Sequence, residues 1–189
     1  MVISPGAYLA LLAALGVERI VELIISARNA RWAFARGATE SGAGHYPVMA
    51  VFHTLFILSC GGEAIFFNRA FPGTVGWIAL AGALFAQGLR YWAVATLGWR
   101  WNTRVIVLPG VAPVASGPYR FMRHPNYLAI VIEMICVPMI YGCWLTAIVF
   151  SAGNAIILRV RISSEESALG VPYQQTFSNL PRLIPRLRH

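Results

Sequence analysis

Long apolar stretches separated by short polar segments make up most of the chain. The runs at 5–27, 47–67 and 73–97 each have about the length of one membrane-spanning helix. A fourth run, 127–158, is longer than one span needs and shorter than two, and Gly142 provides a break near its middle. We therefore predict an all-α polytopic membrane protein with about five transmembrane helices, the last two forming a helical hairpin.

The composition supports a membrane protein and excludes an ordinary soluble domain. Of the 189 residues, 58% are hydrophobic and only 12% are charged, and the mean hydropathy is +0.63. A chain of this length is most simply a single domain. No basic segment precedes the first apolar run and ionisable residues interrupt it, so we do not expect a cleaved signal peptide.

The charges are distributed unevenly along the chain. Every basic side chain other than histidine is an arginine and every acidic one is a glutamate, giving a formal net charge of +8. Because the arginines lie between apolar runs, we predict contact with membrane lipid and no nucleic-acid binding. Most arginines outside the apolar runs lie in residues 28–46, in residues 98–126 and in the C-terminal tail, whereas the loop at residues 68–72 holds only Arg69. The positive-inside rule then predicts that these three segments are cytoplasmic and that the N-terminus lies on the opposite side.

Several ionisable residues lie within the apolar runs. Glu18 and Glu22 share a helix face, with Arg19 beside them. These three side chains either pair at the membrane interface or line a polar cavity. Glu133 could pair across the bundle with Arg90, and we assign it no catalytic role.

No pattern indicates a metal site or a disulfide. Cys60, Cys136 and Cys143 lie in or beside apolar runs without C-x-x-C spacing, so we interpret them as small buried hydrophobic residues. His53 is expected to be hydrogen-bonded within the bundle, because no second histidine follows at a metal-binding spacing. Glu63, in the same run, has no predicted role.

A polar, proline-containing block precedes the last hairpin. Gly117 and Tyr119 are followed by Arg-His-Pro-Asn-Tyr at 123–127. Pro125 suits the first turn of a helix, because its missing N–H would have no helical partner there. The remaining N–H groups and the helix dipole favour an anion, with His124 beside them.

A second polar block ends the hairpin, with the pattern Arg-x-x-x-Glu-Glu-x-x-Leu from Arg161 to Leu169. Arg161 and Glu165 are four residues apart and share a helix face, whereas Glu166 points about 100° around the helix. We therefore expect one glutamate to line a site and the other to serve a different role. The alternative is a simple interfacial salt bridge between Arg161 and Glu165.

The two polar blocks, and the order in which they follow each other, resemble the sequence motifs of the isoprenylcysteine carboxyl methyltransferase family. Members of this family are small integral-membrane enzymes that use S-adenosylmethionine. The likeness covers roughly the C-terminal half, from about Arg90 onward. It implies one methyltransferase domain over 1–189, with three N-terminal spans in 1–97 and a cofactor-binding and catalytic half in 98–189. The family usually has a glycine two residues after the tyrosine of the first block, where this chain has Ala129.

The resemblance also implies which residues form the site. Arg161 would face the methyl acceptor, and Glu166 or His124 would be the base where the acceptor must lose a proton. The positions that match the family's cofactor contacts are Val111, Ala112, Pro113, Val114, Tyr119, His124, Pro125, Asn126, Tyr127 and Glu165.

The implied reaction transfers a methyl group from S-adenosylmethionine to an oxygen of a lipophilic acceptor and leaves S-adenosylhomocysteine. That oxygen belongs to a carboxylate, as in prenylcysteine, or to a phenol or enol.

Two other classes of function stay open. The Arg-His-Pro-Asn-Tyr block also resembles NADPH-dependent sterol and steroid reductases, and a non-catalytic membrane scaffold would equally explain the apolar runs.

Overall fold

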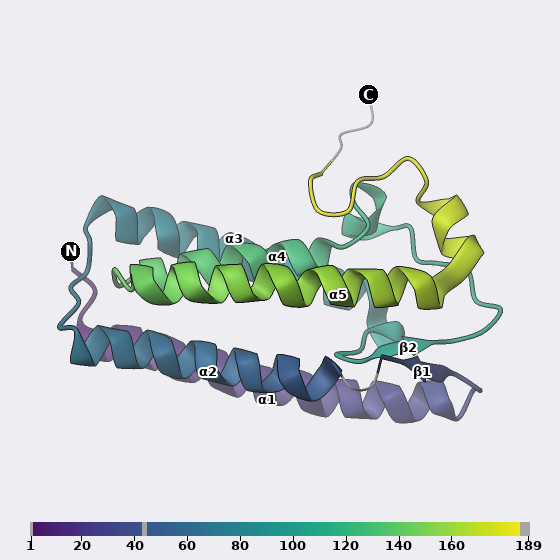
Figure 1. Cartoon of the computed structure of the whole chain (residues 1–189), viewed down its shortest axis with the longest axis horizontal. Coiled ribbons are helices and arrows are strands. Elements are labelled where there is room, and N and C mark those ends of the chain that lie inside the picture. Colours follow the sequence, from purple (N-terminus) through teal and green to yellow (C-terminus); the bar gives the residue numbers. More distant parts are fainter. Residues whose placement is uncertain (1, 43–44, 186–189) are drawn as a thin grey trace.

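The computed structural model describes residues 2–42 and 45–185, which form an elongated bundle of α-helices (Figure 1). Successive helices run back and forth along the long axis, so the bundle has two ends. The helices are α1 (Pro5–Phe34), α2 (His45–Phe66), α3 (Thr74–Leu97), α4 (Pro125–Met139) and α5 (Trp144–Thr176). The predicted helical class is therefore confirmed for the described residues.

Within the described residues, α2, α3 and α5 are long and apolar enough to cross a membrane. The prediction of five transmembrane helices is thus confirmed only in part. The 15 residues of α4 span ~22 Å at 1.5 Å per residue, less than the ~30 Å hydrocarbon core of a bilayer. The 30 residues of α1 are long enough, but Glu18, Arg19 and Glu22 interrupt its apolar character.

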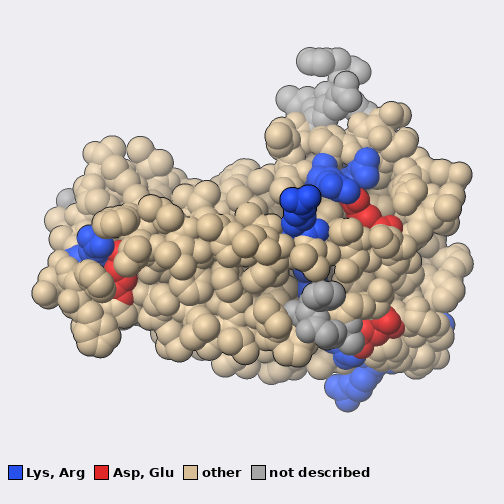
Figure 2. Space-filling view, viewed as in Figure 1, with Lys and Arg blue, Asp and Glu red and all other residues tan. Residues whose placement is uncertain are grey.

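The outer surface of the bundle suits a lipid environment. Figure 2 shows charged side chains toward the two ends of the molecule, with a band between them that carries none on this face. Large apolar side chains are exposed on the three long apolar helices. They include Leu58, Ile78, Leu84, Phe85, Ile148, Val149 and Ile156.

Aromatic and sulfur-containing side chains pack the core near the N-terminal end of the bundle. Tyr8 stacks on Tyr141 with ring centroids 4.9 Å apart, and its hydroxyl donates to the carbonyl of Val137 at 3.2 Å. Cys60 and Cys143 are fully buried beside them, and all three cysteines are free thiols. The interpretation of these cysteines as buried hydrophobic residues is confirmed for this pair. The predicted break in the hairpin also lies here, between α4 and α5.

The polar connections gather at the opposite end of the bundle (Figure 1). There, β1 (Thr39–Ser41) pairs antiparallel with β2 (Val105–Val107), a small sheet that the sequence did not predict. Two 3₁₀ turns, η1 (Gly98–Arg100) and η2 (Gly117–Arg120), complete the long connection between α3 and α4. The tail crosses the same end; its Arg186 and Arg188 lie outside the described residues. The three arginine-rich segments thus share one end, as predicted.

Replacing Glu63 by glutamine should lower the thermal stability. The buried carboxylate accepts the backbone N–H groups of Leu145 (3.2 Å) and Thr146 (2.6 Å) at the start of α5 and pairs with Arg69 at 2.9 Å. Losing the ion pair and one charged acceptor should cost about 1–2 kcal/mol, which lowers Tm by about 3–6 °C. Thermal unfolding in detergent measures this loss. The exposed Gln175→Ala variant should leave Tm unchanged, and an unaltered Tm for Glu63→Gln would show that Glu63 does not fasten α2 to α5.

Candidate active site

The long connection between α3 and α4 is fastened to the end of α1. Ser26 Oγ donates to Asn102 Oδ1 at 2.8 Å, and the Asn102 amide donates back to the Ser26 carbonyl at 3.0 Å. The Asn29 amide donates to the carbonyl of Trp101 at 2.8 Å. Because these partners are buried or half-buried, the bonds hold the connection firmly across the end of the bundle.

The first polar block enters α4 as predicted. Pro125 is the first residue of the helix and His124 is its N-cap. Upstream, Gly117 has a φ of +56°, and a β-carbon there would lie 2.4 Å from Oγ1 of Thr96 on α3. Only glycine fits this turn without strain and crowding. Ala129 is fully buried, so the packing accommodates the methyl group where the family usually has glycine.

A cavity of about 540 Å³, called here the larger cavity, lies between the long connection, the start of α4 and the end of α5. It brings together most of the residues singled out in the sequence: Val111, Ala112, Pro113, Val114, Tyr119, His124, Asn126, Tyr127, Arg161 and Glu165. Pro125 is buried behind this lining, and Glu166 is not part of it. Tyr173 and Phe177 add an aromatic wall that the sequence did not indicate.

Tyr127 joins the two polar blocks. Arg161 Nε donates to its hydroxyl at 2.8 Å, and that hydroxyl donates to Glu165. Among the described residues no ion pair joins Arg161 directly to Glu165, so the simple salt bridge is not what forms. Arg161 also donates through Nη2 to the Thr103 carbonyl and through Nη1 to the sulfur of Met49, at 3.1 Å. The guanidinium is therefore fixed from α2, α4 and the long connection together.

Glu166 contacts the tail instead of the cavity. Arg182 donates to both of its carboxylate oxygens, at 3.2 and 2.6 Å, and His124 Nε2 lies 3.1 Å from Oε1. Hydrogen bonding to Glu166 raises the pKa of Arg182, which therefore stays charged at physiological pH. Arg123 and His124 also donate their backbone N–H groups to tail carbonyls at 3.0 Å. The two neighbouring glutamates thus have separate partners, as their angular offset predicts.

Aromatic rings shape the larger cavity beside these charges. His124 stacks on Tyr127 with centroids 5.2 Å apart, and Tyr173 lies 6.2 Å from the same imidazole. Burial, reinforced by the nearby Glu165 carboxylate, raises the pKa of Tyr119. The Tyr119 phenol therefore stays protonated and can act as a hydrogen-bond donor at neutral pH.

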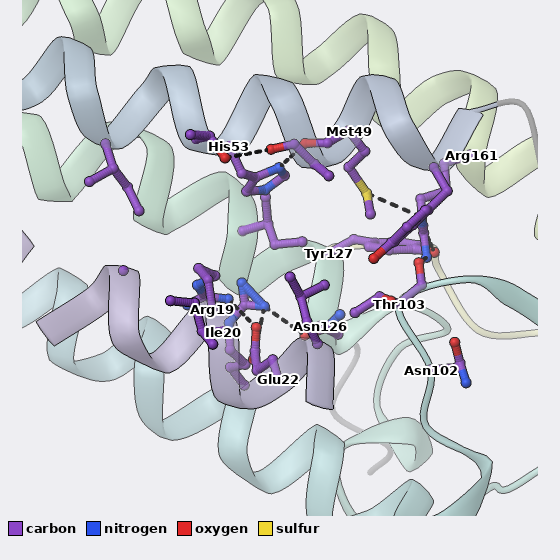
Figure 3. A pocket seen from close by; sticks show the side chains of 18 of the residues that line it. Arg19, Ile20, Glu22, Met49, His53, Asn102, Thr103, Asn126, Tyr127 and Arg161 are labelled. Carbon is purple, nitrogen blue, oxygen red and sulfur yellow. Dashed lines mark hydrogen bonds and ion pairs between the residues drawn. The ribbon is translucent and has the colours of Figure 1, made fainter. Parts of the chain in front are cut away.

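A second cavity of about 360 Å³, the smaller cavity, lies among α1, α2 and α4 (Figure 3). Ile20, Leu23 and Leu58 line it and are also exposed on the outside of the bundle, so it borders the lipid-facing surface. The residues that line both cavities are Trp101, Asn102, Asn126, Tyr127 and Arg161. The two cavities therefore meet at Arg161 and Tyr127.

An array of ion pairs forms part of the wall of the smaller cavity. Arg19 binds Glu22 at 2.6 Å and Glu133 at 3.2 Å. Arg90, almost fully buried, binds Glu133 at 3.1 Å, so the pairing suggested for these two residues is confirmed. Of the two interpretations of Glu18, Arg19 and Glu22, the lining of a cavity is supported for Arg19 and Glu22, which also pair with each other. Glu18 is not part of the lining and accepts a hydrogen bond from Gln87. Mutual pairing offsets the cost of placing these charges in an apolar bundle.

His53 on α2 faces the smaller cavity as well. Its Nδ1 lies 2.9 Å from the carbonyl of Met49, which confirms the expected hydrogen bond within the bundle. In the described part of the chain, no group of three or more His, Cys, Asp or Glu side chains could hold a metal ion.

Comparison with known proteins identifies the family. The model of the isoprenylcysteine carboxyl methyltransferase (ICMT) family matches residues 77–171, which contain both polar blocks. The chain belongs to the ICMT family. It is similar to the uncharacterized protein YpbQ of Bacillus subtilis, with 39% identity over 160 residues, covering 84% of this chain and 94% of the relative. An uncharacterized protein of Haemophilus influenzae is 31% identical over 152 residues, covering 80% and 88% of the two chains.

Membership in the ICMT family indicates a methyltransferase-like function. The matched region covers most of α3, the long connection, α4 and most of α5, yet residues outside it also build the cavities. Arg19 carried a signal in the sequence, since an arginine inside an apolar run is unusual. Met49 and Thr103 carried none: Met49 is an ordinary apolar residue there, and Thr103 acts through a backbone carbonyl that any residue could supply.

Replacing Arg182 by alanine should loosen the tail while leaving the bundle folded. Glu166 loses the guanidinium that donates to both of its oxygens, but the backbone hydrogen bonds from Arg123 and His124 to the tail remain. Because this pair is partly exposed, exchange protection of residues 178–185 should fall only about two- to fivefold. Hydrogen–deuterium exchange measures this change. Arg159→Ala, at an exposed position on α5, should leave the exchange protection of the tail unchanged. Equal protection in both variants would show that Arg182 does not hold the tail in place.

Proposed function

We propose that this protein is an integral-membrane methyltransferase that moves a methyl group from S-adenosylmethionine to an oxygen of a lipophilic acceptor. The observation that carries the proposal is the meeting of two cavities at Arg161 and Tyr127. Most of the predicted site residues from the two polar blocks line the larger cavity, and the smaller one borders the lipid-facing surface. Methyl transfer needs the reacting atoms of two bound molecules to be held in contact, and this junction is where that contact would occur.

The lining of the larger cavity suits S-adenosylmethionine. The Glu165 carboxylate can accept hydrogen bonds from the ammonium group of the cofactor. Backbone groups of 111–114 and the ring of Tyr119 can hold the adenine. When bound, the cofactor supplies a methyl group on a cationic sulfur.

The cofactor's carboxylate needs hydrogen-bond donors in the same cavity. The first turn of α4 offers fewer than the sequence suggests, because the N–H groups of Tyr127 and Leu128 already donate to the His124 carbonyl. Arg123 lines the cavity beside this turn and carries a guanidinium. We therefore add Arg123 to the predicted cofactor contacts as the partner of the carboxylate.

Arg161 is the residue proposed to meet the acceptor. Among the described residues, the one hydrogen-bond partner of its Nη1 is the weakly accepting sulfur of Met49, so that N–H is readily exchanged for an acceptor oxygen. An arginine fork suits a carboxylate, and a fixed cation also stabilises a phenolate or enolate. The apolar remainder of the smaller cavity can hold the hydrocarbon part of the acceptor.

Glu166 was predicted to act as a base, and its position favours another role. It lines neither cavity, and both of its oxygens have partners. We therefore assign Glu166 to positioning, and leave Arg161 as the catalytic residue of the pair. We also propose that this end of the bundle faces the cytoplasm, because the arginine-rich segments gather there.

S-adenosylhomocysteine should raise the Tm of the purified protein, and NADPH should not, because only the former matches the proposed site. Replacing Glu165 by glutamine removes the charged partner of the ammonium and should weaken S-adenosylhomocysteine binding by about tenfold or more. Isothermal titration measures the affinity. Glu63→Gln, the same substitution at the far end of the bundle, should leave the affinity unchanged. Stabilisation by NADPH alone would favour the reductase alternative.

Replacing Arg161 by glutamine should lower kcat/KM for the acceptor by about a hundredfold, because the charge at the reacting oxygen is lost. The affinity for S-adenosylhomocysteine should change little in comparison. Transfer of labelled methyl groups to farnesylated cysteine and to 4-dodecylphenol, which represent the carboxylate and phenol classes, gives the rates. Equal losses in cofactor affinity and acceptor turnover would place Arg161 in the cofactor site alone.

A further inference from the structure

Two arginines and two tryptophans form a continuous stack at the end of α1. The guanidinium carbon of Arg28 lies 4.4 Å from the ring centroid of Trp99, which belongs to η1. Trp99 stacks on Trp32 with ring centroids 6.1 Å apart, and the guanidinium carbon of Arg36 lies 4.3 Å from the Trp32 ring. We call these four residues the Arg–Trp stack. It holds the Arg28 guanidinium against an aromatic face, which limits where its N–H groups can point.

Arg28 and Arg31 are neighbouring cations on the exposed surface of α1. They are three residues apart on the helix, so their side chains project from adjacent positions of one face. Among the described residues, neither of them forms an ion pair with a glutamate. Arg104, at the same end of the bundle, pairs with Glu40 instead. The two guanidinium groups can therefore bind an anion from outside the protein.

This pair of arginines lies at the depth expected for lipid headgroups. The apolar span of α2, Tyr46–Phe66, has 21 residues and extends ~31 Å, about the thickness of the hydrocarbon core. Beside it, α1 continues past the start of α2 toward β1 (Figure 1). Arg28 lies ~35 Å along α1 from its first residue, Pro5, at 1.5 Å per residue. Trp32 and Trp99 add the aromatic rings that are typical of a membrane–water interface.

The same side of α1 continues toward the membrane interior as an apolar stripe. Val17, Val21 and Ile24 are large apolar side chains that the fold leaves exposed. Together with Arg28 they follow one another at intervals of three or four residues, so they lie on one side of the helix. The three apolar side chains line neither cavity. An apolar stripe that ends in a pair of cations matches a phospholipid, whose acyl chains adjoin an anionic phosphate.

We propose that Arg28 and Arg31 bind the phosphate of an anionic phospholipid in the leaflet at this end of the bundle. The Arg–Trp stack positions the Arg28 guanidinium, and Arg31 approaches the same phosphate from the next turn. An arginine fork donates two parallel hydrogen bonds to a phosphate, and stacking on an aromatic ring leaves that fork free to do so. The acyl chains lie along the apolar stripe. This binding does not depend on the methyl-transfer reaction.

The apolar stripe distinguishes a lipid from a small anion. An inorganic phosphate ion would satisfy the two arginines but would gain nothing from Val17, Val21 and Ile24. The charge of the headgroup matters as well, because phosphatidylcholine carries a cation beside its phosphate and phosphatidylglycerol does not. Each arginine near a membrane surface should therefore favour the anionic lipid by about fivefold.

The test is native mass spectrometry of the purified protein in detergent, titrated with dioleoyl phosphatidylglycerol or with dioleoyl phosphatidylcholine. The two lipids have the same acyl chains, so the ratio of their affinities for the first bound position reports the headgroup alone. The wild type should bind phosphatidylglycerol about tenfold or more tightly than phosphatidylcholine. The double variant Arg28→Gln, Arg31→Gln should bind the two lipids with affinities within about twofold of each other.

The matched control is the double variant Arg120→Gln, Arg159→Gln, which removes the same charge from two other exposed arginines. Its affinity ratio should stay within about twofold of the wild-type ratio. Arg28→Lys keeps the charge but loses the planar group that stacks on Trp99, so it should lower the ratio about threefold. If the Arg28, Arg31 double variant does not unfold cooperatively on heating, Arg31→Gln alone takes its place and should lower the ratio about fivefold.

Several results would overturn the inference. An unchanged affinity ratio in the Arg28, Arg31 variant would show that these residues bind no headgroup. An equal loss in the matched control would mean that the net charge of +8 attracts anionic lipid diffusely, without a site. A wild-type ratio in Arg28→Lys would show that the Arg–Trp stack positions nothing. Complete displacement of phosphatidylglycerol by 10 mM sodium phosphate would identify a site for small anions instead of lipid.

Discussion

The hydroxyl of Tyr127, held between Arg161 and Glu165, is the contact on which the rest of the structure depends. It joins the start of α4 to the end of α5, so it fixes the two polar blocks relative to each other. Tyr127 and Arg161 also line both the larger and the smaller cavity. A single hydroxyl that both accepts from a cation and donates to an anion keeps both charges in place without letting them neutralise each other directly.

Elsewhere in the described bundle, buried charged groups lie against partners of opposite charge. Arg90 and Glu133 pair in the wall of the smaller cavity, and Glu63 fastens the start of α5 at the far end. Unpaired, each of these groups would be costly among apolar helices. Paired, they hold neighbouring helices in one register.

Much of the site could be predicted from the sequence, because its residues belong to two dense polar blocks. The shared face of Arg161 and Glu165, and the separate role of Glu166, follow from helix geometry alone. The transmembrane prediction was less accurate. α4 is too short to span a bilayer unaided, and two of the charges midway along α1, Arg19 and Glu22, line a cavity where the sequence favoured a place at the membrane interface.

Other parts of the site left no trace in the sequence. Strands of three residues, such as β1 and β2, have no detectable period, and their pairing depends on a connection that folds across the bundle. The Thr103 carbonyl that accepts a hydrogen bond from Arg161 is a backbone group, which every residue carries, so the sequence does not indicate this contact. Nor does any local pattern show that the tail returns to Glu166, because that contact joins Arg182 across a kink at Gly170.

The most direct test of the central claim is a structure of the protein in lipid nanodiscs with S-adenosylhomocysteine and a long-chain acceptor bound together. The account predicts the nucleoside against residues 111–114, the sulfur facing Tyr127, and the acceptor's chain between α1 and α2 with its oxygen at Arg161. A cofactor bound outside the larger cavity, or an acceptor whose oxygen lies far from Arg161, would contradict it.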